Sequence, residues 1–193
     1  MQVADLIRCE RLACRGVALD RHSVPNGPGN PDSVAIVMVA GAVPPDPAYW
    51  LCTVEAFRAA GENVETLADV EALGVYLTTA VKCGKTGYPV TRETIEACSY
   101  LLEEELGLFP LAQVLLLMGD LAIKAVNVIA ERNHEPRPVP TGATYRIRGG
   151  DFRFRGMRVF PSYLQVGPAF YIEKSKRRMI AEDIAAALAC VRG

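Results

Sequence analysis

Aromatic residues, histidine and long apolar runs are scarce in this 193-residue chain. Phe, Trp and Tyr make up 7% of the residues, Trp50 is the only tryptophan, and there are two histidines. The longest apolar run, residues 34–43, is too short to cross a bilayer, which needs about 20 residues. Charged residues precede any hydrophobic stretch near the N-terminus, so we expect no signal peptide. These absences predict a cytoplasmic protein without membrane contact.

The composition is that of a globular chain, with 50% apolar and 22% charged residues. This length suits one domain with a sizeable core, so we expect residues 1–193 to form a single, monomeric domain. The net charge of −1 conceals an asymmetry: residues 1–123 hold 8 Lys and Arg against 16 Asp and Glu, and residues 124–193 hold 13 against 6. The basic C-terminal third predicts a phosphate-facing surface, with an ordinary solvated face as the alternative.

Hydrophobic periodicity predicts an α/β fold. Continuous apolar runs indicate buried strands, and helical patterns follow them closely, as in an open parallel sheet. We therefore expect a three-layer sandwich with a four-stranded, mostly parallel central sheet. The expected strands are residues 33–43, 75–81, 113–118 and 157–160, the last of them stopped by Pro161. The expected helices are residues 3–14, 54–60, 67–72, 91–106, 119–130 and 175–191, and a hairpin is expected from residues 144–147 and 152–154.

Ligands of such sheets bind outside the carboxyl ends of the strands. Four segments reach that edge in the expected fold, and they are the candidate site: residues 41–46, 78–85, 119–120 and 160–165.

Cysteines are the strongest candidates for metal ligands. Cys9 and Cys14 lie near the N-terminus, and Cys83 and Cys98 flank a loop after the second strand. In a reduced compartment such residues favour metal ligation or core packing over disulfides. If the two pairs converge on one metal, the N-terminal segment is held against the loop after the second strand.

Five segments resemble the uracil-DNA glycosylase superfamily, in particular its iron–sulfur-containing bacterial and archaeal branch. Their order and spacing carry the resemblance, which extends from about Cys9 to Ala187. The segments are residues 36–42 (IVMVAGA), 76–83 (YLTTAVKC), 94–98 (TIEAC), 115–122 (LLLMGDLA) and 159–162 (VFPS).

The resemblance implies that the four cysteines bind a structural [4Fe–4S] cluster. The first two family cysteines usually have two residues between them, whereas Cys9 and Cys14 have four. Residues five apart on a regular helix point about 140° away from each other, so ligation requires the helix to end before Cys14. Zinc and the absence of any metal are the alternatives.

The resemblance also implies an extruded base and cleavage of its bond to the sugar. The family uses an acid or amide in its first motif, an Asn at the end of the second strand, and a His in the third motif. These positions are Gly41, Thr79 and Phe160 here. None of these residues supplies the chemistry of its family counterpart, so we expect ordinary uracil excision to be absent.

Substitutes for the missing groups are present nearby. Asp46, in the proline-rich turn after the first strand, is the candidate acid, with a turn-forming role as its alternative. Trp50 is a candidate for stacking on the base or for core packing. The residues expected to line the base pocket are Gly41, Ala42, Tyr49, Thr79, Phe160 and Ser162.

A DNA-contacting surface is expected beside that pocket. The start of the last helix is rich in cations that can neutralise phosphates. The expected DNA contacts are Lys82, Lys85, Gln165, Lys174, Lys176, Arg177 and Arg178, and the arginines at 146, 148, 153, 155 and 158 extend the surface.

Three functions are consistent with this pattern. The first is a divergent glycosylase that acts on another damaged base, and the second is a non-catalytic, iron–sulfur-stabilised module that recognises DNA or a base. The third is a cluster-bearing scaffold for a protein partner.

Overall fold

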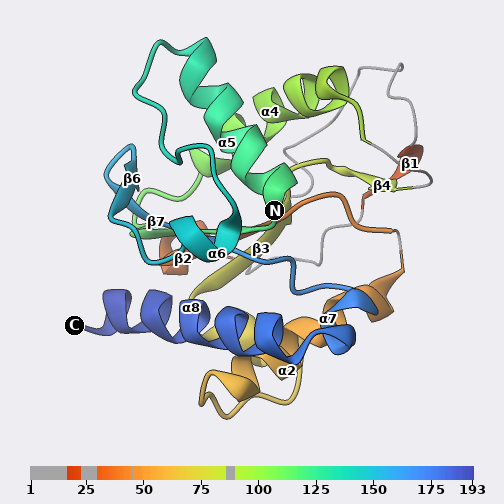
Figure 1. Ribbon diagram of the computed structural model, residues 1–193, viewed down its shortest axis with the longest axis vertical. Helices are drawn as coiled ribbons and strands as arrows, with labels where there is room; N and C mark the ends of the chain where they lie inside the picture. Colours follow the sequence, from red (N-terminus) through yellow and green to blue (C-terminus); the bar gives the residue numbers. More distant parts are fainter. Residues whose placement is uncertain (1–16, 23–29, 45, 86–89) are drawn as a thin grey trace.

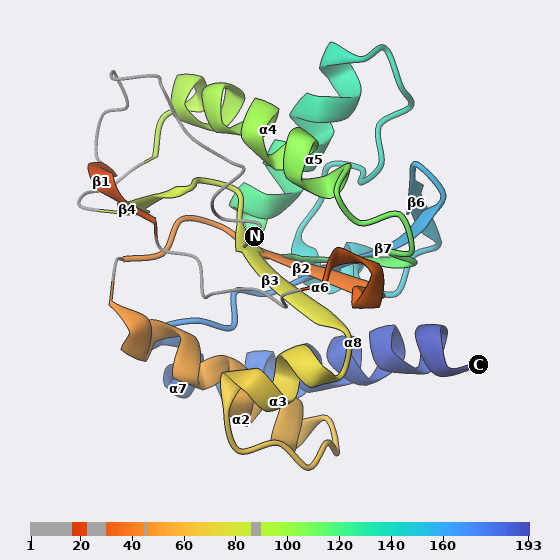
Figure 2. The ribbon, with the colours of Figure 1, turned by 180° about the vertical axis from the view of Figure 1, so that it is seen from behind.

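The computed structural model describes residues 17–22, 30–44, 46–85 and 90–193. A five-stranded sheet lies in the middle of the molecule, and helices cover both of its faces (Figures 1 and 2). The strand order is β3-β2-β5-β7-β6. Four of these strands are parallel, and they are β2 (Ile36–Ala40), β3 (Val75–Thr79), β5 (Val114–Met118) and β7 (Met157–Ser162). The three-layer α/β architecture predicted from the sequence is therefore confirmed.

The fifth strand, β6 (Phe152–Phe154), is antiparallel to β7 and was not expected as part of the main sheet. Arg155 and Gly156 connect the two strands with φ angles of 49° and 87°. Positive φ at both central residues is the geometry of a tight hairpin turn. The predicted hairpin was therefore placed one turn too early.

Residues 144–147, predicted as a strand, form the one-turn helix α6 (Thr144–Ile147) instead. Thr144 is buried and Ile147 packs against the core, whereas Tyr145 and Arg146 between them are exposed. This three-residue spacing of inward-facing side chains is helical. Only four residues follow this pattern, so it was not distinguishable from strand alternation.

Strand β7 continues through Pro161, which was predicted to stop it. The antiparallel partner β6 pairs with β7 only as far as Val159. The carbonyl of Ser162 accepts a hydrogen bond from Gly119 N on the β5 side. The nitrogen of Pro161, one residue earlier, therefore points to the opposite side of β7, beyond the end of β6. Its missing N–H therefore costs no ladder hydrogen bond.

Two helical layers complete the fold. One face of the sheet, hereafter the α4/α5 face, is covered by α4 (Arg92–Leu106) and α5 (Asp120–Arg132). The other, the α2/α8 face, is covered by α2 (Leu51–Ala59) and α8 (Lys174–Arg192). Thr91 caps α4 by accepting a hydrogen bond from Thr94 N, as predicted. The short helices are η1 (Pro31–Ser33), η2 (Pro47–Trp50), α3 (Leu67–Ala72) and α7 (Ala169–Ile172).

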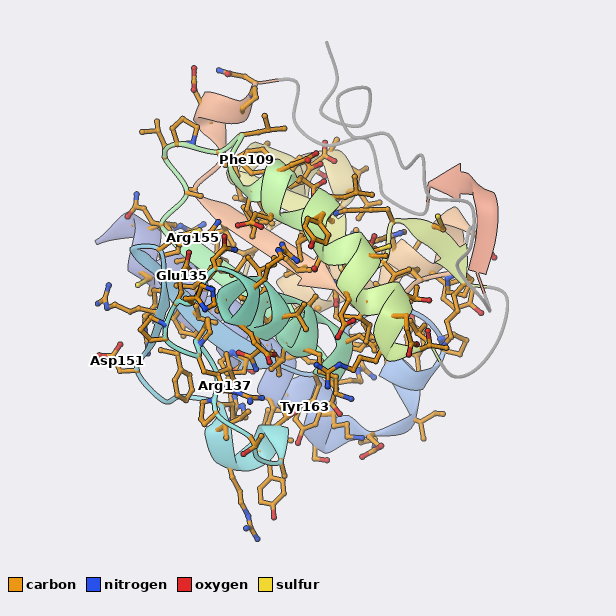
Figure 3. All side chains as sticks on the ribbon, turned by 90° about the horizontal axis from the view of Figure 1, so that it is seen from above. Phe109, Glu135, Arg137, Asp151, Arg155 and Tyr163 are labelled. Carbon is orange, nitrogen blue, oxygen red and sulfur yellow. The ribbon has the colours of Figure 1, made fainter. Side chains whose placement is uncertain are left out.

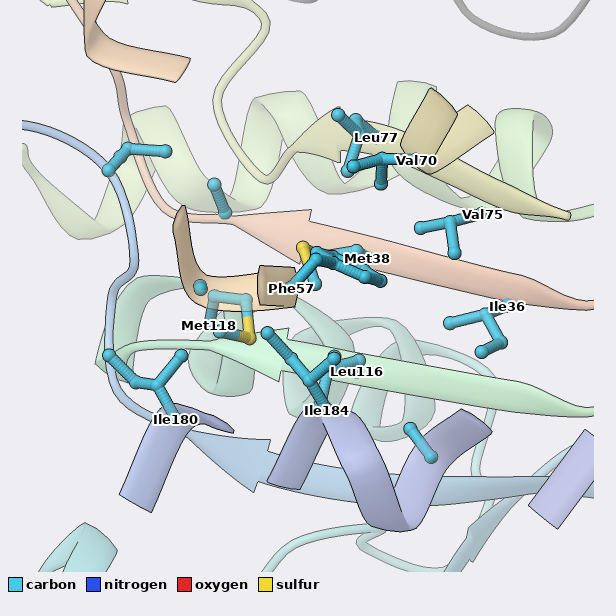
Figure 4. Packing of buried hydrophobic residues seen from close by; sticks show 14 of the residues in the cluster. Ile36, Met38, Phe57, Val70, Val75, Leu77, Leu116, Met118, Ile180 and Ile184 are labelled. Carbon is cyan, nitrogen blue, oxygen red and sulfur yellow. The ribbon is translucent and has the colours of Figure 1, made fainter. Parts of the chain in front are cut away.

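Alternate residues of each central strand serve the two faces. On β2, Val37 and Val39 pack toward α4 and α5, whereas Met38 packs toward α2 and α8. Figure 4 shows Met38, Leu116 and Ile184 together on the α2/α8 side. Within the described part of the chain, no helix has the length and apolar character of a membrane span.

A two-stranded antiparallel ladder lies apart from this sheet. Strand β1 (Val17–His22) pairs with β4 (Cys83–Lys85), so that Val17 lies opposite Lys85. The expected helix at residues 3–14 lies outside the described residues. The ladder places β1 beside β4, the segment that follows β3 and contains Cys83.

Candidate functional site

The carboxyl ends of four strands meet at one level of the sheet. Ala40 at the end of β2 lies between Thr79 of β3 and Met118 of β5, and Met118 lies opposite Ser162 of β7. The strand ends, with the candidate residues Thr79 and Ser162, therefore lie at one edge. The edge nevertheless divides into two parts, because the residues on it face different helical layers.

Gly41 and Ala42 face the α4/α5 side of the edge. A Cβ atom at Gly41 would lie 3.1 Å from Leu121 Cβ and 3.3 Å from its Cδ1. Ala42 packs with Cys83 and Cys98 in a small buried cluster. Leu121 thus packs tightly against Gly41, where the sequence resemblance implies the family's catalytic acid, and it has to shift slightly for any larger residue.

Thr79, Phe160 and Ser162 belong to the opposite part of the edge. Phe160 is 8% exposed and packs in the core of the α2/α8 face. The Arg158 guanidinium lies 5.0 Å from the centre of its ring. The hydroxyl of Thr79 is buried and has no hydrogen-bond partner among the described residues.

Ser162 is held from below by an aspartate that the sequence analysis did not single out. Its hydroxyl donates to Asp183 Oδ2 at 2.6 Å, and Arg148 Nη2 donates to Asp183 Oδ1 at 2.8 Å. Burial raises the pKa of Asp183, although Arg148 and Ser162 act in the opposite direction. The sequence contained one signal for this role of Asp183: it precedes Ile184, which belongs to the apolar stripe of the last helix. This network fixes the third motif against α8 and leaves the Ser162 hydroxyl engaged.

Asp46 and Trp50 were each predicted to have either a functional or a structural role. Both have structural contacts. Asp46 Oδ1 accepts a hydrogen bond from Ala48 N at 2.9 Å and so caps η2. Trp50 is 2% exposed and packs in the core. These contacts account for Asp46 as a turn former and for Trp50 as a core residue.

Tyr49 lies against the loop that follows the third motif. A Cβ at Gly167, where φ is +79°, would fall 2.8 Å from the Tyr49 ring, and Gly167 N donates to Tyr49 O. Gly167 thus allows the loop to pack closely on Tyr49. The side chain of Gln165, from the same loop, is fully buried, which does not support its predicted contact with DNA.

Lys82 is also an interior residue. It is 2% exposed, and its ammonium donates to Glu105 Oε2 and to Thr78 Oγ1. Tyr76 donates to the other oxygen of Glu105 at 2.8 Å, and burial, followed by the charge of Glu105, raises the pKa of Tyr76. Lys82 therefore joins β3 to α4 and does not face a phosphate in this arrangement.

Four of the remaining predicted cations lie on the surface at the start of α8. Lys176 pairs with Glu173 and lies 5.3 Å from the Tyr163 ring centre, and Arg177 lies 5.1 Å from that of Phe170. Arg178 and Lys174 are exposed. Leu164 and Ile172, 38% and 78% exposed, lie in the loop and the short helix that precede these cations. Lys85 lies elsewhere, in the β1–β4 ladder.

Most of the arginines expected to extend this surface are paired with acids. Figure 3 shows Arg155 beside Glu135, and Arg155 also contacts Glu103. Arg158 pairs with Asp151 at 2.8 Å, and Arg148 is engaged by α8. The hairpin arginines are therefore largely neutralised. At the start of α8, Lys176 and Arg178 also pair with acids, Glu173 and Glu182, and Lys174 is exposed.

The described half of the cysteine site is buried. Cys83 and Cys98 are 6% and 1% exposed and pack in the same cluster with Val81. Cys9 and Cys14 lie outside the described residues. Within the described ranges, three or more metal-ligating side chains do not gather at any point.

A pocket of about 580 Å³ lies beside α4 and α5, and Leu121, which packs against Gly41, is part of its lining. Apolar side chains of Val90, Ile95 and Leu121 line it together with Arg92 and Lys124. Sequence reasoning did not anticipate it, because the helices that form it meet only in the folded chain.

Comparison with known proteins gives a similarity to part of a DNA glycosylase. No protein-family model matches the chain. The chain is similar to a type-5 uracil-DNA glycosylase from Thermus thermophilus, with 32% identity over 99 residues. The aligned part covers 51% of this chain and 45% of that relative, so the chain matches less than half of the relative's length. The similarity is thus to part of a uracil-DNA glycosylase, a member of the superfamily that the five sequence segments resemble.

Proposed function

We propose that this protein binds DNA through the carboxyl edge of its sheet and recognises a base there without rapid excision. The single observation that carries the proposal is the packing of Leu121 against Gly41. Gly41 carries no carboxylate, and even a Cβ there would require Leu121 to shift by a few tenths of an ångström. Phe160 provides no hydrogen bond where the family places a histidine. The similarity to a uracil-DNA glycosylase supports DNA repair as the setting.

Electrostatic attraction to DNA comes from the start of α8 in this proposal. Lys174 and its neighbours lie next to the exposed apolar side chains of Leu164 and Ile172. Cations that contact phosphates make affinity fall steeply with salt, whereas apolar groups contact bases. Exposed cations beside apolar side chains therefore suit a nucleic-acid surface.

Binding of short duplexes at several salt concentrations tests this surface. We expect Lys174→Gln to weaken binding to every sequence and to lower the salt slope by about one unit. Arg192→Gln is the matched control, since it removes a cation from the other end of α8, where Arg192 pairs with Glu62. Equal effects of the two variants, or affinity independent of salt, would contradict the proposal.

We further propose that Cys9, Cys14, Cys83 and Cys98 hold a [4Fe–4S] cluster, with zinc as the alternative. Cys83 and Cys98 pack in one buried cluster, so two of the four proposed ligands lie together. Cys14 precedes Val17 by three residues, a stretch of at most about 11 Å, and β1 pairs with β4 at that point. A bound group would crosslink the N-terminal segment to β4 and α4, a structural role.

Protein purified without oxygen provides the test of this site. We expect a brown protein with about four irons per chain, and loss of both colour and iron in Cys98→Ser. Cys190→Ser, which changes an exposed cysteine at the end of α8, should retain both. A colourless protein with zinc would favour the alternative, and a metal-free protein would contradict both.

Excision is tested separately with single-turnover assays on uracil-containing DNA. We expect no release of uracil by the protein as it stands. Rapid release would refute the non-catalytic proposal and would direct attention back to Asp46 as the acid.

A further inference from the structure

The pocket beside α4 and α5 has the size of a small-molecule site. Its volume of about 580 Å³ falls within the range of about 300–1,000 Å³ that is usual for ligand pockets. Among its described lining residues there are none of the predicted DNA contacts. The pocket is therefore a feature that the proposed DNA surface does not use.

Part of the pocket lining is apolar. Val90 and Ile95 come from the segment that enters α4, and Leu121 and Val128 come from α5. Leu121, Lys124 and Val128 are spaced by three and four residues, so they lie along one side of α5. Ligand pockets typically combine such an apolar wall with a few polar groups that orient the ligand.

The guanidinium of Arg137, which also lines the pocket, is oriented by the backbone. Its Nε donates to the carbonyl of Val139 at 3.0 Å. The buried amide of Asn127 fixes Val139 in turn, since it donates to the same carbonyl at 3.0 Å and accepts from Val139 N at 3.1 Å. The terminal nitrogens of Arg137 have no hydrogen-bond partner among the described residues. Arg137 thus keeps two NH₂ groups available in a fixed orientation.

Some of the other charged side chains in the lining are already paired. Arg92 pairs with Glu96 at 2.6 Å, and Glu135 pairs with Arg155 at 2.8 Å. Glu131 is the remaining acid of the pocket. The charge balance of the pocket therefore depends on which cations stand against this one carboxylate.

Two cations do so. Lys124 is exposed on α5 and forms no ion pair within the part of the chain that the structure describes. Arg137 likewise has no ion pair there. Together they outnumber Glu131, so the pocket has a positive excess beside its apolar wall.

We propose that this pocket binds a small organic phosphate, in which a phosphate group is joined to an apolar ring. A phosphate monoester carries nearly two negative charges at pH 7, so it suits two cations better than a carboxylate does. The free edge of a guanidinium binds phosphate oxygens in a bidentate manner. Arg137 and Lys124 hold the phosphate, and the ring packs against Leu121 and Val128.

Phenyl phosphate is the simplest probe of this chemistry. Inorganic phosphate lacks the ring, and benzoate keeps the ring but carries a single charge. Each compound is titrated at about pH 7.5 into the isotopically labelled full chain, and the amide chemical shifts of α5 report binding. We expect saturable shifts with phenyl phosphate and at least about tenfold weaker binding of the other two, because each lacks one of the two contacts.

Variants of exposed side chains test the two cations with little risk to folding. Lys124→Gln and Arg137→Gln should each weaken phenyl phosphate binding by about tenfold or more, the effect of hydrogen bonds to a charged group. Arg137→Lys keeps the charge without the bidentate edge and should lie between Arg137→Gln and the wild type. Lys174→Gln is the matched control, because Lys174 is exposed at the start of α8 and should leave binding unchanged. Thermal unfolding shows that each variant folds.

Several results would overturn the proposal. One is the absence of saturable shifts with phenyl phosphate, and another is binding of inorganic phosphate or benzoate as tight as that of phenyl phosphate. Equal losses in Lys124→Gln and Lys174→Gln would also overturn it, since they would reflect general attraction of anions. The DNA surface at α8 is tested by other residues, so none of these results bears on the proposed function.

Discussion

The two faces of the sheet differ in how completely their buried polar groups are satisfied, although the α2/α8 face also holds a satisfied network of Asp183 with Ser162 and Arg148. On the α4/α5 face, Lys82, Glu105, Tyr76 and Thr78 satisfy one another in a closed network. On the α2/α8 face, Thr53, Thr79 and Gln165 each leave an atom without a partner among the described residues. A satisfied network holds two elements in place, whereas unsatisfied atoms reduce stability. The contrast separates the polar groups that support the fold from those that cost it stability.

The largest expected effect comes from opening the satisfied network. Glu105→Leu leaves the buried ammonium of Lys82 without its counter-charge, so unfolding should become easier by about 3–5 kcal/mol. The double variant Lys82→Met/Glu105→Leu removes both charges and should recover most of that loss. Urea unfolding measures both, and a mild effect of Glu105→Leu would mean that the network is not structural.

The next largest effect on stability is expected from substitution of Gly41, which packs against Leu121. Gly41→Glu forces a side chain into Leu121 and should cost about 1–3 kcal/mol of folding stability by overpacking. Adding Leu121→Ala creates space and should recover part of the loss, as followed by thermal unfolding. Full stability of Gly41→Glu alone would show that Leu121 moves aside readily.

A smaller effect of opposite sign is expected on the α2/α8 face. Thr53→Val and Thr79→Val each replace an unpartnered hydroxyl by a methyl group, so each should raise the free energy of unfolding by about 1 kcal/mol. Urea midpoints test this gain. Destabilisation in either variant would mean that the hydroxyl has a partner, for example an ordered water, and would remove the contrast between the faces.

The smallest effect is a pH dependence at the outer end of the α4/α5 face. Burial raises the pKa of Glu103, but Arg132 and Arg155 outweigh it, so the pKa lies below its usual value of 4.5. This stabilisation is present above pH 4.5 and is lost as the pH falls through the lower, folded-state pKa. The stability advantage of the wild type over Glu103→Gln, up to about 1 kcal/mol for a partly exposed pair, should therefore shrink below pH 4.5. An advantage that is constant from roughly pH 6 to pH 3 would contradict this assignment.

The sequence by itself determined the layers of this protein. Buried strands such as β2 and β5 were predictable as continuous apolar runs, and the start of α4 was predictable from the capping residue Thr91. Both signals are local properties of the chain. The edge that carries Gly41, Thr79 and Ser162 followed from the order of those strands. The hairpin and α6 were misplaced because segments of three or four residues are too short for their period to be read.

Only the tertiary structure decided what the site residues contact. Leu121 packs against Gly41, although the two residues are 80 positions apart in the chain. Asp183 accepts a hydrogen bond from Ser162, and Gln165, from the loop after β7, donates one to Met38 on β2. Lys82 was expected at the surface, yet Glu105 makes its burial tolerable. Partners of this kind are distant in sequence and leave no periodic signal, so packing alone selects which polar groups are satisfied and which are left without a partner.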